Sequence, residues 1–292
     1  MSVLRYSRPH ACGNLPELLY LQDSTRRMTS HHPSTVPGFD AVSLTLNGSE
    51  RVVYRRGTGR AVIVMSEVPG ITPQVARFAT RVADAGFSVW MPQLFGTAMR
   101  PLTPASVAST MARVCISREF RLLTANSSSP IVDWLRALAR HAHAECGGPG
   151  VGTVGMCLTG NFGLAMMLDA PVIAPVLSQP SLPAGLTHAQ RSGLHASAEE
   201  IAAAHDKIKH QGARILGLRF KQDPMCRAER FERLREEFGV AFEGIEIDAK
   251  HANPRAMKPA HSVVTTHLID REGEPTRKAL NQVLSFLKAQ LN

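Results

Sequence analysis

The segment 151–167 changes from strand-like to helix-like character within one or two residues, and a cysteine stands at the junction. The apolar run Val151–Met156 leads directly into Cys157, and Gly155 and Gly160 flank the thiol. A backbone that passes from a strand into a helix without a loop turns so sharply that a side chain two places before the turn would collide with neighbouring chain. This pattern predicts a nucleophile elbow, which presents the thiol at the carboxyl edge of a β-sheet.

Cys157 also has a simpler interpretation. Free cysteine is among the most buried residue types and often packs as a small, unreactive apolar side chain. The G-x-C-x-x-G pattern alone does not separate the two interpretations, because short motifs gain meaning only from their structural context. The chain has five cysteines with no regular spacing and no C-x-x-C pair, so we expect reduced thiols and neither a disulfide framework nor a structural metal site.

Around this cysteine, continuous apolar runs alternate with segments of helical period. This alternation is typical of a parallel sheet covered by helices on both faces. The expected parallel strands are Ala61–Met65, Phe87–Met91, Val151–Met156, Val172–Leu177, Ile215–Phe220 and Val240–Ile247. The expected helices are Pro73–Ala85, Ile131–Ala144, Leu158–Leu168, Ala196–Lys209, Arg227–Phe238 and Pro275–Gln290.

The amino-terminal part of the chain has a different character. Residues 1–37 mix Ser, Thr, His, Pro and Arg without a sustained period, which indicates a poorly ordered leader. An antiparallel hairpin is then indicated by alternation in Val42–Leu46, an Asn-Gly turn and the returning run Val52–Tyr54. We therefore expect one α/β domain over residues 38–292, in which this hairpin joins an otherwise parallel sheet.

The chain carries a formal charge of +9, from 33 Lys plus Arg against 24 Asp plus Glu. Basic chains can bind nucleic acid, but here the cations are dispersed, and aromatic residues make up only 5%, too few for a base-stacking platform. No stretch reaches the roughly 18 uninterrupted apolar residues of a membrane span, and the amino terminus lacks a secretory pattern. We expect no nucleic-acid partner, no membrane association and a cytoplasmic location.

A cysteine nucleophile needs a base, and the base needs an acid to orient it. In an elbow architecture both follow the nucleophile along the chain, the acid first. Asp223 follows the run Ile215–Phe220 and precedes a proline, which suits the acid, although aspartate before proline is also a common turn residue. For the base, His261 lies in a semi-apolar stretch, whereas His251 has the surroundings of an exposed turn. His261 is preferred, and His267 is the third candidate.

A second carboxylate follows the first expected parallel strand. Glu67 comes two residues after Ala61–Met65, on the loop that leads into a helix. Elbow architectures build their oxyanion hole on this loop, so Glu67 should face the Cys157 thiol. The alternative is a solvated glutamate that interacts with the dipole of the following helix.

Four separated segments together resemble the dienelactone hydrolases, cysteine members of the α/β-hydrolase fold. The resemblance covers about residues 38–291, and its segments are Ser66-Glu67-Val68-Pro69-Gly70, Gly155-Met156-Cys157-Leu158-Thr159-Gly160, Gln222-Asp223 and Ala260-His261-Ser262. It implies Cys157 as nucleophile, His261 as base and Asp223 as its orienting acid. It also implies an oxyanion hole from the backbone N–H groups of Val68 and Leu158. In the family, the residue at the Glu67 position helps to switch the cysteine between a quiet thiol and a reactive thiolate.

Two positions depart from the family's pattern. Thr159 stands where the elbow commonly has glycine, so it either crowds the turn or supplies a hydroxyl. Thr265 stands where the characteristic enzyme has an arginine that grips the substrate carboxylate. Arg118 and Arg121 are candidates for a substitute cation, and Ser262 is a candidate for a further substrate contact.

The sequence thus predicts an α/β-hydrolase that cleaves a small ester or lactone through an acyl-cysteine intermediate. We expect it to need no metal or organic cofactor and to act as a monomer or small homo-oligomer. Two other functions stay open. One is acyl transfer or thioester hydrolysis on the same triad, and the other is a non-catalytic binding protein in which the elbow serves packing.

Overall fold

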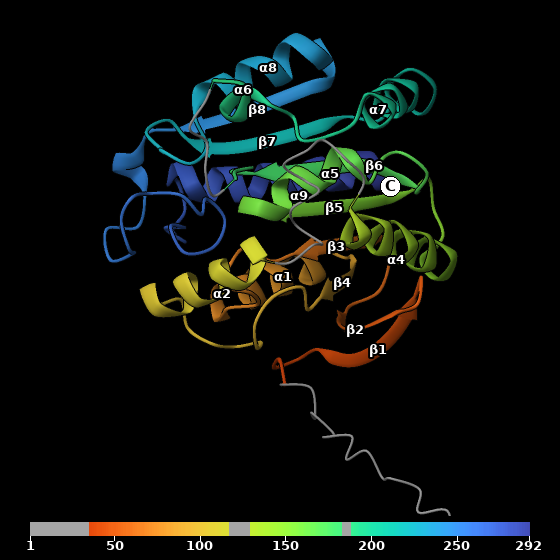
Figure 1. Cartoon of the computed structure of the whole chain (residues 1–292), viewed down its shortest axis with the longest axis horizontal. Helices are drawn as coiled ribbons and strands as arrows, with labels where there is room; N and C mark the ends of the chain where they lie inside the picture. Colours follow the sequence, from red (N-terminus) through yellow and green to blue (C-terminus); the bar gives the residue numbers. More distant parts are fainter. Residues whose placement is uncertain (1–34, 117–128, 183–187) are drawn as a thin grey trace, which may run out of the picture. The chain divides into compact units, whose positions relative to one another are not determined.

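The residues that the structure describes fold around a mixed β-sheet. The computed structural model describes residues 35–116, 129–182 and 188–292 (Figure 1). Its strands are Asp40–Leu46 (β1), Ser49–Arg56 (β2), Ala61–Met65 (β3), Ser88–Pro92 (β4), Val151–Met156 (β5), Val172–Ser178 (β6), Ile215–Phe220 (β7) and Phe242–Ile247 (β8). Within the described ranges they form one eight-stranded sheet in the order β1-β2-β4-β3-β5-β6-β7-β8. The pairs β1–β2 and β2–β4 are antiparallel, and the other neighbours are parallel.

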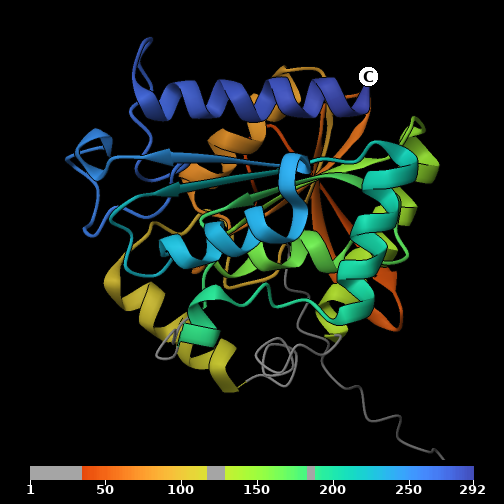
Figure 2. The same ribbon diagram turned by 90° about the horizontal axis from the view of Figure 1, so that it is seen from above.

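Helices cover both faces of this sheet. Pro73–Asp84 (α1) and Pro275–Leu291 (α9) lie over one face, and Pro130–Cys146 (α4), Ala198–Gln211 (α7) and Ala228–Phe238 (α8) lie over the other (Figure 2). The shorter or more peripheral elements are Pro104–Ile116 (α2), Phe162–Ala165 (α5), His188–Ser192 (α6) and the 3-10 turns Cys157–Asn161 (η2), Gly239–Ala241 (η3) and Ala249–His251 (η4). The predicted parallel sheet between two helical layers is confirmed.

The burial of each strand follows its place in the sheet. Every residue of β3, β5 and β7 is buried, as expected for parallel strands packed between two helical layers. The edge strand β1 instead alternates exposed and half-buried residues. The last strand begins at Phe242 and not at the predicted Val240, because η3 intervenes and leaves Val240 94% exposed.

The predicted hairpin is confirmed at the start of the described chain. The turn between β1 and β2 has positive φ values at both Asn47 (49°) and Gly48 (74°), as an Asn-Gly hairpin turn requires. Only residues 35–37 of the predicted leader are described, and among them Val36 is 2% exposed in the hydrophobic core. The described residues belong to one compact unit. No helix within them is long and apolar enough to cross a membrane.

The helix predicted over Leu158–Leu168 is shorter than expected. The chain forms η2 and then the single-turn helix α5, because this segment contains glycines, which disfavour regular helix. One of them is closely packed, since a Cβ on Gly163 would lie 2.6 Å from the end of the Leu177 side chain of β6. The end of α5 is held from α4 instead, where Arg136 donates from Nε and Nη2 to the Ala165 carbonyl at 2.9 and 2.7 Å.

Arg136 also forms a buried ion pair with Glu200 of α7. We expect Arg136→Met to lower the free energy of unfolding by about 3–5 kcal/mol, because it takes the charged donor away from a buried carboxylate. Arg140→Met is the matched control, since Arg140 pairs with Asp169 but is 45% exposed, and its loss should amount to less than about 1 kcal/mol. Urea unfolding followed by circular dichroism measures both variants, and equal losses would contradict this account of α5.

Candidate active site

At the elbow of Cys157, the backbone before the thiol and the backbone after it lie very close together. Cys157 has a φ of 56°, in the left-handed region that residues other than glycine rarely adopt. A Cβ on Gly155 would lie 2.2 Å from the carbonyl oxygen of Thr159, and a Cβ on Gly160 would lie 2.9 Å from the Cα of Pro180. The sharp turn that the sequence predicts is therefore confirmed. At both flanking positions, a residue larger than glycine would collide with neighbouring backbone.

Thr159 supplies a hydroxyl to this turn. Its Oγ1 accepts a hydrogen bond from the Met156 N–H at 2.8 Å and donates to the Met65 carbonyl at 3.0 Å. The side chain is fully buried, so it joins the end of β5 to the end of β3 without contact with solvent. Of the two interpretations offered for this departure from glycine, the structure confirms the hydroxyl.

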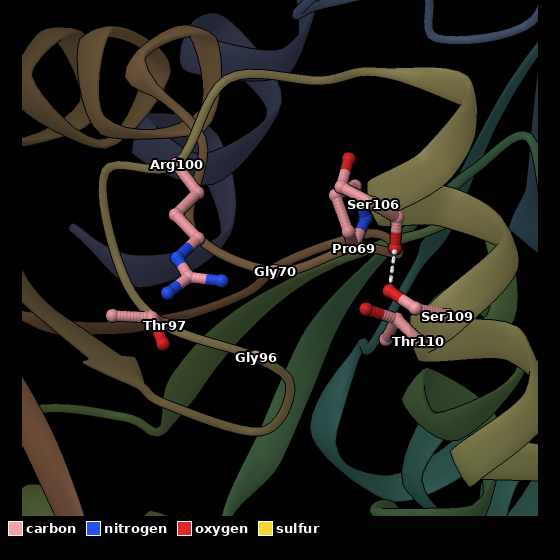
Figure 3. Close-up of a pocket in the computed structure, with 8 residues that line it drawn as sticks. All are labelled: Pro69, Gly70, Gly96, Thr97, Arg100, Ser106, Ser109 and Thr110. Carbon is pink, nitrogen blue, oxygen red and sulfur yellow. Dashed lines mark hydrogen bonds between the residues drawn. The ribbon is translucent and has the colours of Figure 1, made fainter.

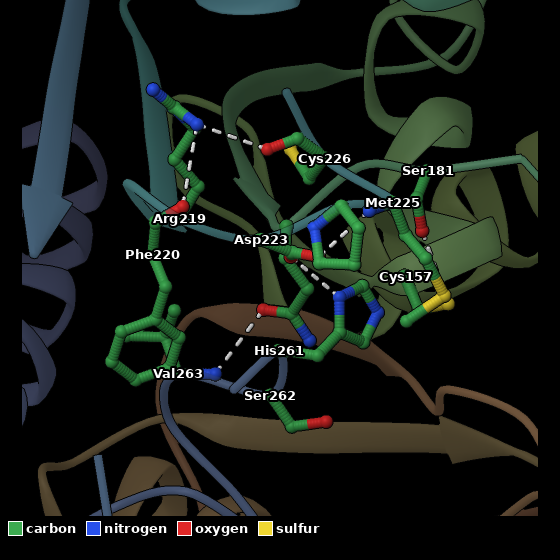
Figure 4. A network of polar contacts seen from close by, with 12 residues as sticks. Cys157, Ser181, Arg219, Phe220, Asp223, Met225, Cys226, His261, Ser262 and Val263 are labelled. Carbon is green, nitrogen blue, oxygen red and sulfur yellow. Dashed lines mark hydrogen bonds and ion pairs between the residues drawn. The ribbon is translucent and has the colours of Figure 1, made fainter. Parts of the chain in front are cut away.

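The Cys157 thiol is half-buried and lies beside a hydroxyl that the sequence analysis did not single out. Cys157 Sγ and Ser181 Oγ are 3.2 Å apart, and the Ser181 N–H donates to the Cys157 carbonyl at 3.1 Å (Figure 4). Ser181 follows β6, the neighbour of β5 in the sheet. Its position shortly after a predicted strand was the available signal for Ser181. That signal could not be used, because the sequence does not show which strand lies next to β5 in the sheet.

Asp223 and His261 form a buried pair on the other side of the thiol. His261 Nδ1 donates to Asp223 Oδ2 at 2.6 Å, and Asp223 Oδ1 accepts from the Met225 N–H at 2.9 Å. Because the carboxylate only accepts, the Nδ1 atom carries a proton. Figure 4 shows the imidazole between the Asp223 carboxylate and Cys157. The pairing expected of the preferred acid and base is present in the structure.

The charges around His261 favour its protonated form. Burial lowers the pKa of His261, but the combined effect of Cys157 and Asp223 is larger and raises it. The net result is a pKa well above 6.5. The imidazole Nε2 is buried and has no hydrogen-bond partner among the described residues.

The other two candidate bases have different surroundings. His251 belongs to η4 and has no hydrogen bond with Asp223 in the described chain. His267 is buried, and its Nδ1 accepts from the backbone N–H groups of Ser262 at 3.1 Å and His261 at 3.4 Å, while Nε2 donates to the Met257 carbonyl at 2.8 Å. His267 therefore holds the backbone that carries His261, a role that the sequence analysis did not anticipate.

Glu67 is bound by three side chains, two of which belong to the loop that follows His261. Its Oε2 accepts from Ser262 Oγ at 2.5 Å and from Gln179 Nε2 at 3.3 Å, and its Oε1 accepts from Thr265 Oγ1 at 2.6 Å. None of the hydrogen bonds that the structure shows for Glu67 goes to Cys157. The alternative of a solvated helix-entry residue is wrong, because Glu67 is 3% exposed. Ser262, expected to contact substrate, uses its hydroxyl on Glu67.

The loop after Glu67 is fixed against the chain that follows β4. The Gly70 N–H donates to the Glu67 carbonyl at 2.8 Å, and a Cβ on Gly70 would lie 2.6 Å from the Phe95 carbonyl oxygen. This turn holds Val68, which is buried, as is Leu158 after the thiol. The two residues expected to provide the oxyanion hole thus lie on rigid backbone.

A cavity of about 80 Å³ adjoins this loop, and its lining residues are Pro69, Gly70, Gly96, Thr97, Arg100, Ser106, Ser109 and Thr110 (Figure 3). Figure 3 shows the Arg100 guanidinium directed into the space between Thr97 and Gly70. The cations expected from the sequence, Arg118 and Arg121, lie outside the described residues. In the described ranges, no group of three or more His, Cys, Asp or Glu side chains is arranged to hold a metal ion.

Comparisons with known proteins bear on the family and the fold of the chain. The model of the dienelactone hydrolase family matches residues 51–291. A putative dienelactone hydrolase from Klebsiella pneumoniae is similar in structure, with a TM-score of 0.58, 16% identity, and coverage of 86% of this chain and 98% of that one. A dienelactone hydrolase-like promiscuous phosphotriesterase from metagenomic libraries has a TM-score of 0.60 and 16% identity, and 87% of this chain and 98% of that one are covered.

A cold-adapted esterase from an Arctic intertidal metagenomic library has a TM-score of 0.54 and 12% identity, and 87% of this chain and 94% of that one are covered. At such identities the likeness shows the fold, and it confirms the α/β-hydrolase fold with a mostly parallel sheet. A sequence comparison with curated proteins gives no match.

The buried His267 makes stability depend on pH in a defined direction. Burial lowers the pKa of His267 below 6.5, although the Met257 carbonyl, Glu67 and Asp223 oppose the shift. Below about pH 6.5 the unfolded chain therefore binds a proton that the folded chain does not, and the free energy of unfolding falls as the pH falls. In His267→Asn, the amide oxygen can still accept from the Ser262 N–H, but nothing titrates.

We expect this variant to lose less stability than the wild type between about pH 7.5 and pH 5.5, as measured by urea unfolding at each pH. His261 contributes with the opposite sign, because its pKa is raised in the folded protein. The same dependence in both proteins would mean that His267 is not held neutral by the fold.

Proposed function

Because this chain belongs to the dienelactone hydrolase family, we propose that it is a hydrolase that cleaves small carboxylic esters or lactones through an acyl-cysteine intermediate. The observation that carries the proposal is the buried Asp223–His261 pair beside the elbow thiol of Cys157. Cys157 is assigned as the nucleophile, His261 as the acid and base, and Asp223 as the carboxylate that orients the imidazole.

In acylation, the Cys157 thiolate attacks the carbonyl carbon, a C–S bond forms, and the carbonyl π electrons move onto the oxygen. The backbone N–H groups of Val68 and Leu158 are assigned to this oxyanion, where fixed donors stabilise the developing charge. When the oxyanion collapses, the C–O bond to the leaving alcohol breaks, and the alkoxide takes the proton from Nε2 of His261. A thioester on Cys157 and a neutral imidazole result.

In deacylation, neutral His261 accepts a proton from water through Nε2, and the oxygen of that water attacks the thioester carbonyl. Collapse of the second oxyanion breaks the C–S bond and returns the thiolate to Cys157. The carboxylic acid leaves, and the imidazolium and thiolate are restored. One water is consumed for each ester cleaved.

Asp223 matters in both steps because it fixes the tautomer of His261. With Nδ1–H bound to the carboxylate, Nε2 is the atom that exchanges protons with the leaving group and water. The raised pKa of His261 fits the acid role in acylation, since the imidazole begins each cycle protonated.

The test is hydrolysis of p-nitrophenyl acetate, with turnover counted beyond one equivalent of enzyme. Cys157→Ala should abolish turnover, and Asp223→Asn should lower kcat by about 10⁴, as loss of the orienting carboxylate does in a serine protease triad. Asp248→Asn is the matched control, because Asp248 is a half-buried carboxylate that caps η4, and its replacement should leave turnover unchanged.

Wild-type turnover by Cys157→Ala would rule out the acyl-cysteine route. A burst of one equivalent, followed by continued turnover only when an alcohol or amine acceptor is added, would indicate acyl transfer. Absence of both burst and turnover would favour a binding protein.

A further inference from the structure

The loop that carries His261 is buried, although it forms neither helix nor strand. Residues 261–265 and 267 are each at most 7% exposed. A buried irregular segment has to satisfy its polar groups inside the protein, because unpaired groups there are costly. Two side chains from distant parts of the chain do this, namely Glu67 after β3 and Gln179 after β6.

Glu67 binds the loop on the carboxyl side of His261 with both of its oxygens. Oε2 accepts from Ser262 Oγ at 2.5 Å, and Oε1 accepts from Thr265 Oγ1 at 2.6 Å. Both are hydrogen bonds to a charged acceptor, which are stronger than neutral ones. Ser262 directly follows His261, so one of these bonds acts on the residue next to the base.

Gln179 binds the backbone of the same loop and is itself firmly held. Its Oε1 accepts from the Val263 N–H at 3.4 Å and from Ser178 Oγ, and its Nε2 donates to Glu67 at 3.3 Å. Gln179 is fully buried, and its N–H donates to the Leu218 carbonyl of β7 at 2.6 Å. The amide therefore joins the loop, the Glu67 carboxylate and the sheet.

We infer that Glu67 and Gln179 are positioning residues, which hold the loop of His261 so that its imidazole faces Cys157. The inference rests on the proposed function, since it assigns His261 as the base. Glu67 acts through Ser262 and Thr265. In this chain, the threonine at position 265 supplies the hydroxyl that fixes one carboxylate oxygen.

The chemistry around Glu67 explains why its carboxylate stays in this place. It has no Lys or Arg partner among the described residues, so two hydroxyls and one amide are the donors that stabilise its buried charge. A movement away from these donors would leave the buried carboxylate without partners, which is unfavourable.

Thr265→Val tests the inference, because valine keeps the shape of threonine and removes the hydroxyl. We expect kcat for p-nitrophenyl acetate to fall about tenfold, the order expected when a hydrogen bond to a charged group is lost, with KM close to that of the wild type. Thr265→Ser keeps the hydroxyl and should restore most of kcat. Ser262→Ala removes the other hydroxyl and should change kcat in the same direction as Thr265→Val.

Two readouts do not depend on ester turnover. The first is the downfield proton resonance of His261 Nδ1–H, which should be sharp in the wild type and Thr265→Ser and broadened or lost in Thr265→Val and Glu67→Gln. The second is alkylation of Cys157 by iodoacetamide as a function of pH without substrate. It should be slower in Thr265→Val and Glu67→Gln, because a displaced imidazolium stabilises the thiolate less.

Faster alkylation in Glu67→Gln would overturn the inference and assign Glu67 a direct effect on the thiol. Wild-type kcat in Thr265→Val with an unchanged His261 resonance would also overturn it. A wild-type protein that cleaves no ester would contradict the proposed function alone, since the resonance and the alkylation would still decide the positioning role.

Discussion

The site depends on the turn at Cys157, where the Thr159 carbonyl passes so close to Gly155 that no side chain fits between them. β5 lies between β3 and β6, so this turn brings the thiol to the edge where both neighbouring strands end. A left-handed φ at a non-glycine residue is unfavourable by about 1–3 kcal/mol and persists only where the surroundings enforce it. The Thr159 hydroxyl and the Ser181 N–H provide that enforcement.

Two buried carboxylates bind His261 and the loop that carries it, each at a different place. Asp223 binds the imidazole itself, and this contact helps to raise the pKa of His261. Glu67 binds Ser262 and Thr265, which belong to the same loop. Because each carboxylate has its own donors, neither competes for the other's partner. This division orients the imidazole and separately fixes the backbone that carries it.

Local patterns made much of this predictable, and long-range contacts did not. The elbow, the parallel strands and the Asp223–His261 pair follow from short motifs and from the order of residues along the chain. Ser181 could not be predicted, because its contact depends on the register between β5 and β6. The hydrogen-bond partners of Glu67 could not be predicted for a similar reason. Its position after β3 is readable, but its partners lie almost 200 residues away.

The most direct test of the account is to trap the acyl-enzyme. Rapid acid quench of the reaction with p-nitrophenyl acetate, followed by digestion and mass spectrometry, locates the acetyl group. The account predicts one acetyl on the peptide that contains Cys157, formed within the first turnover and lost as hydrolysis proceeds. Acetyl on Ser181, or steady turnover with no covalent adduct in the wild type, would contradict it.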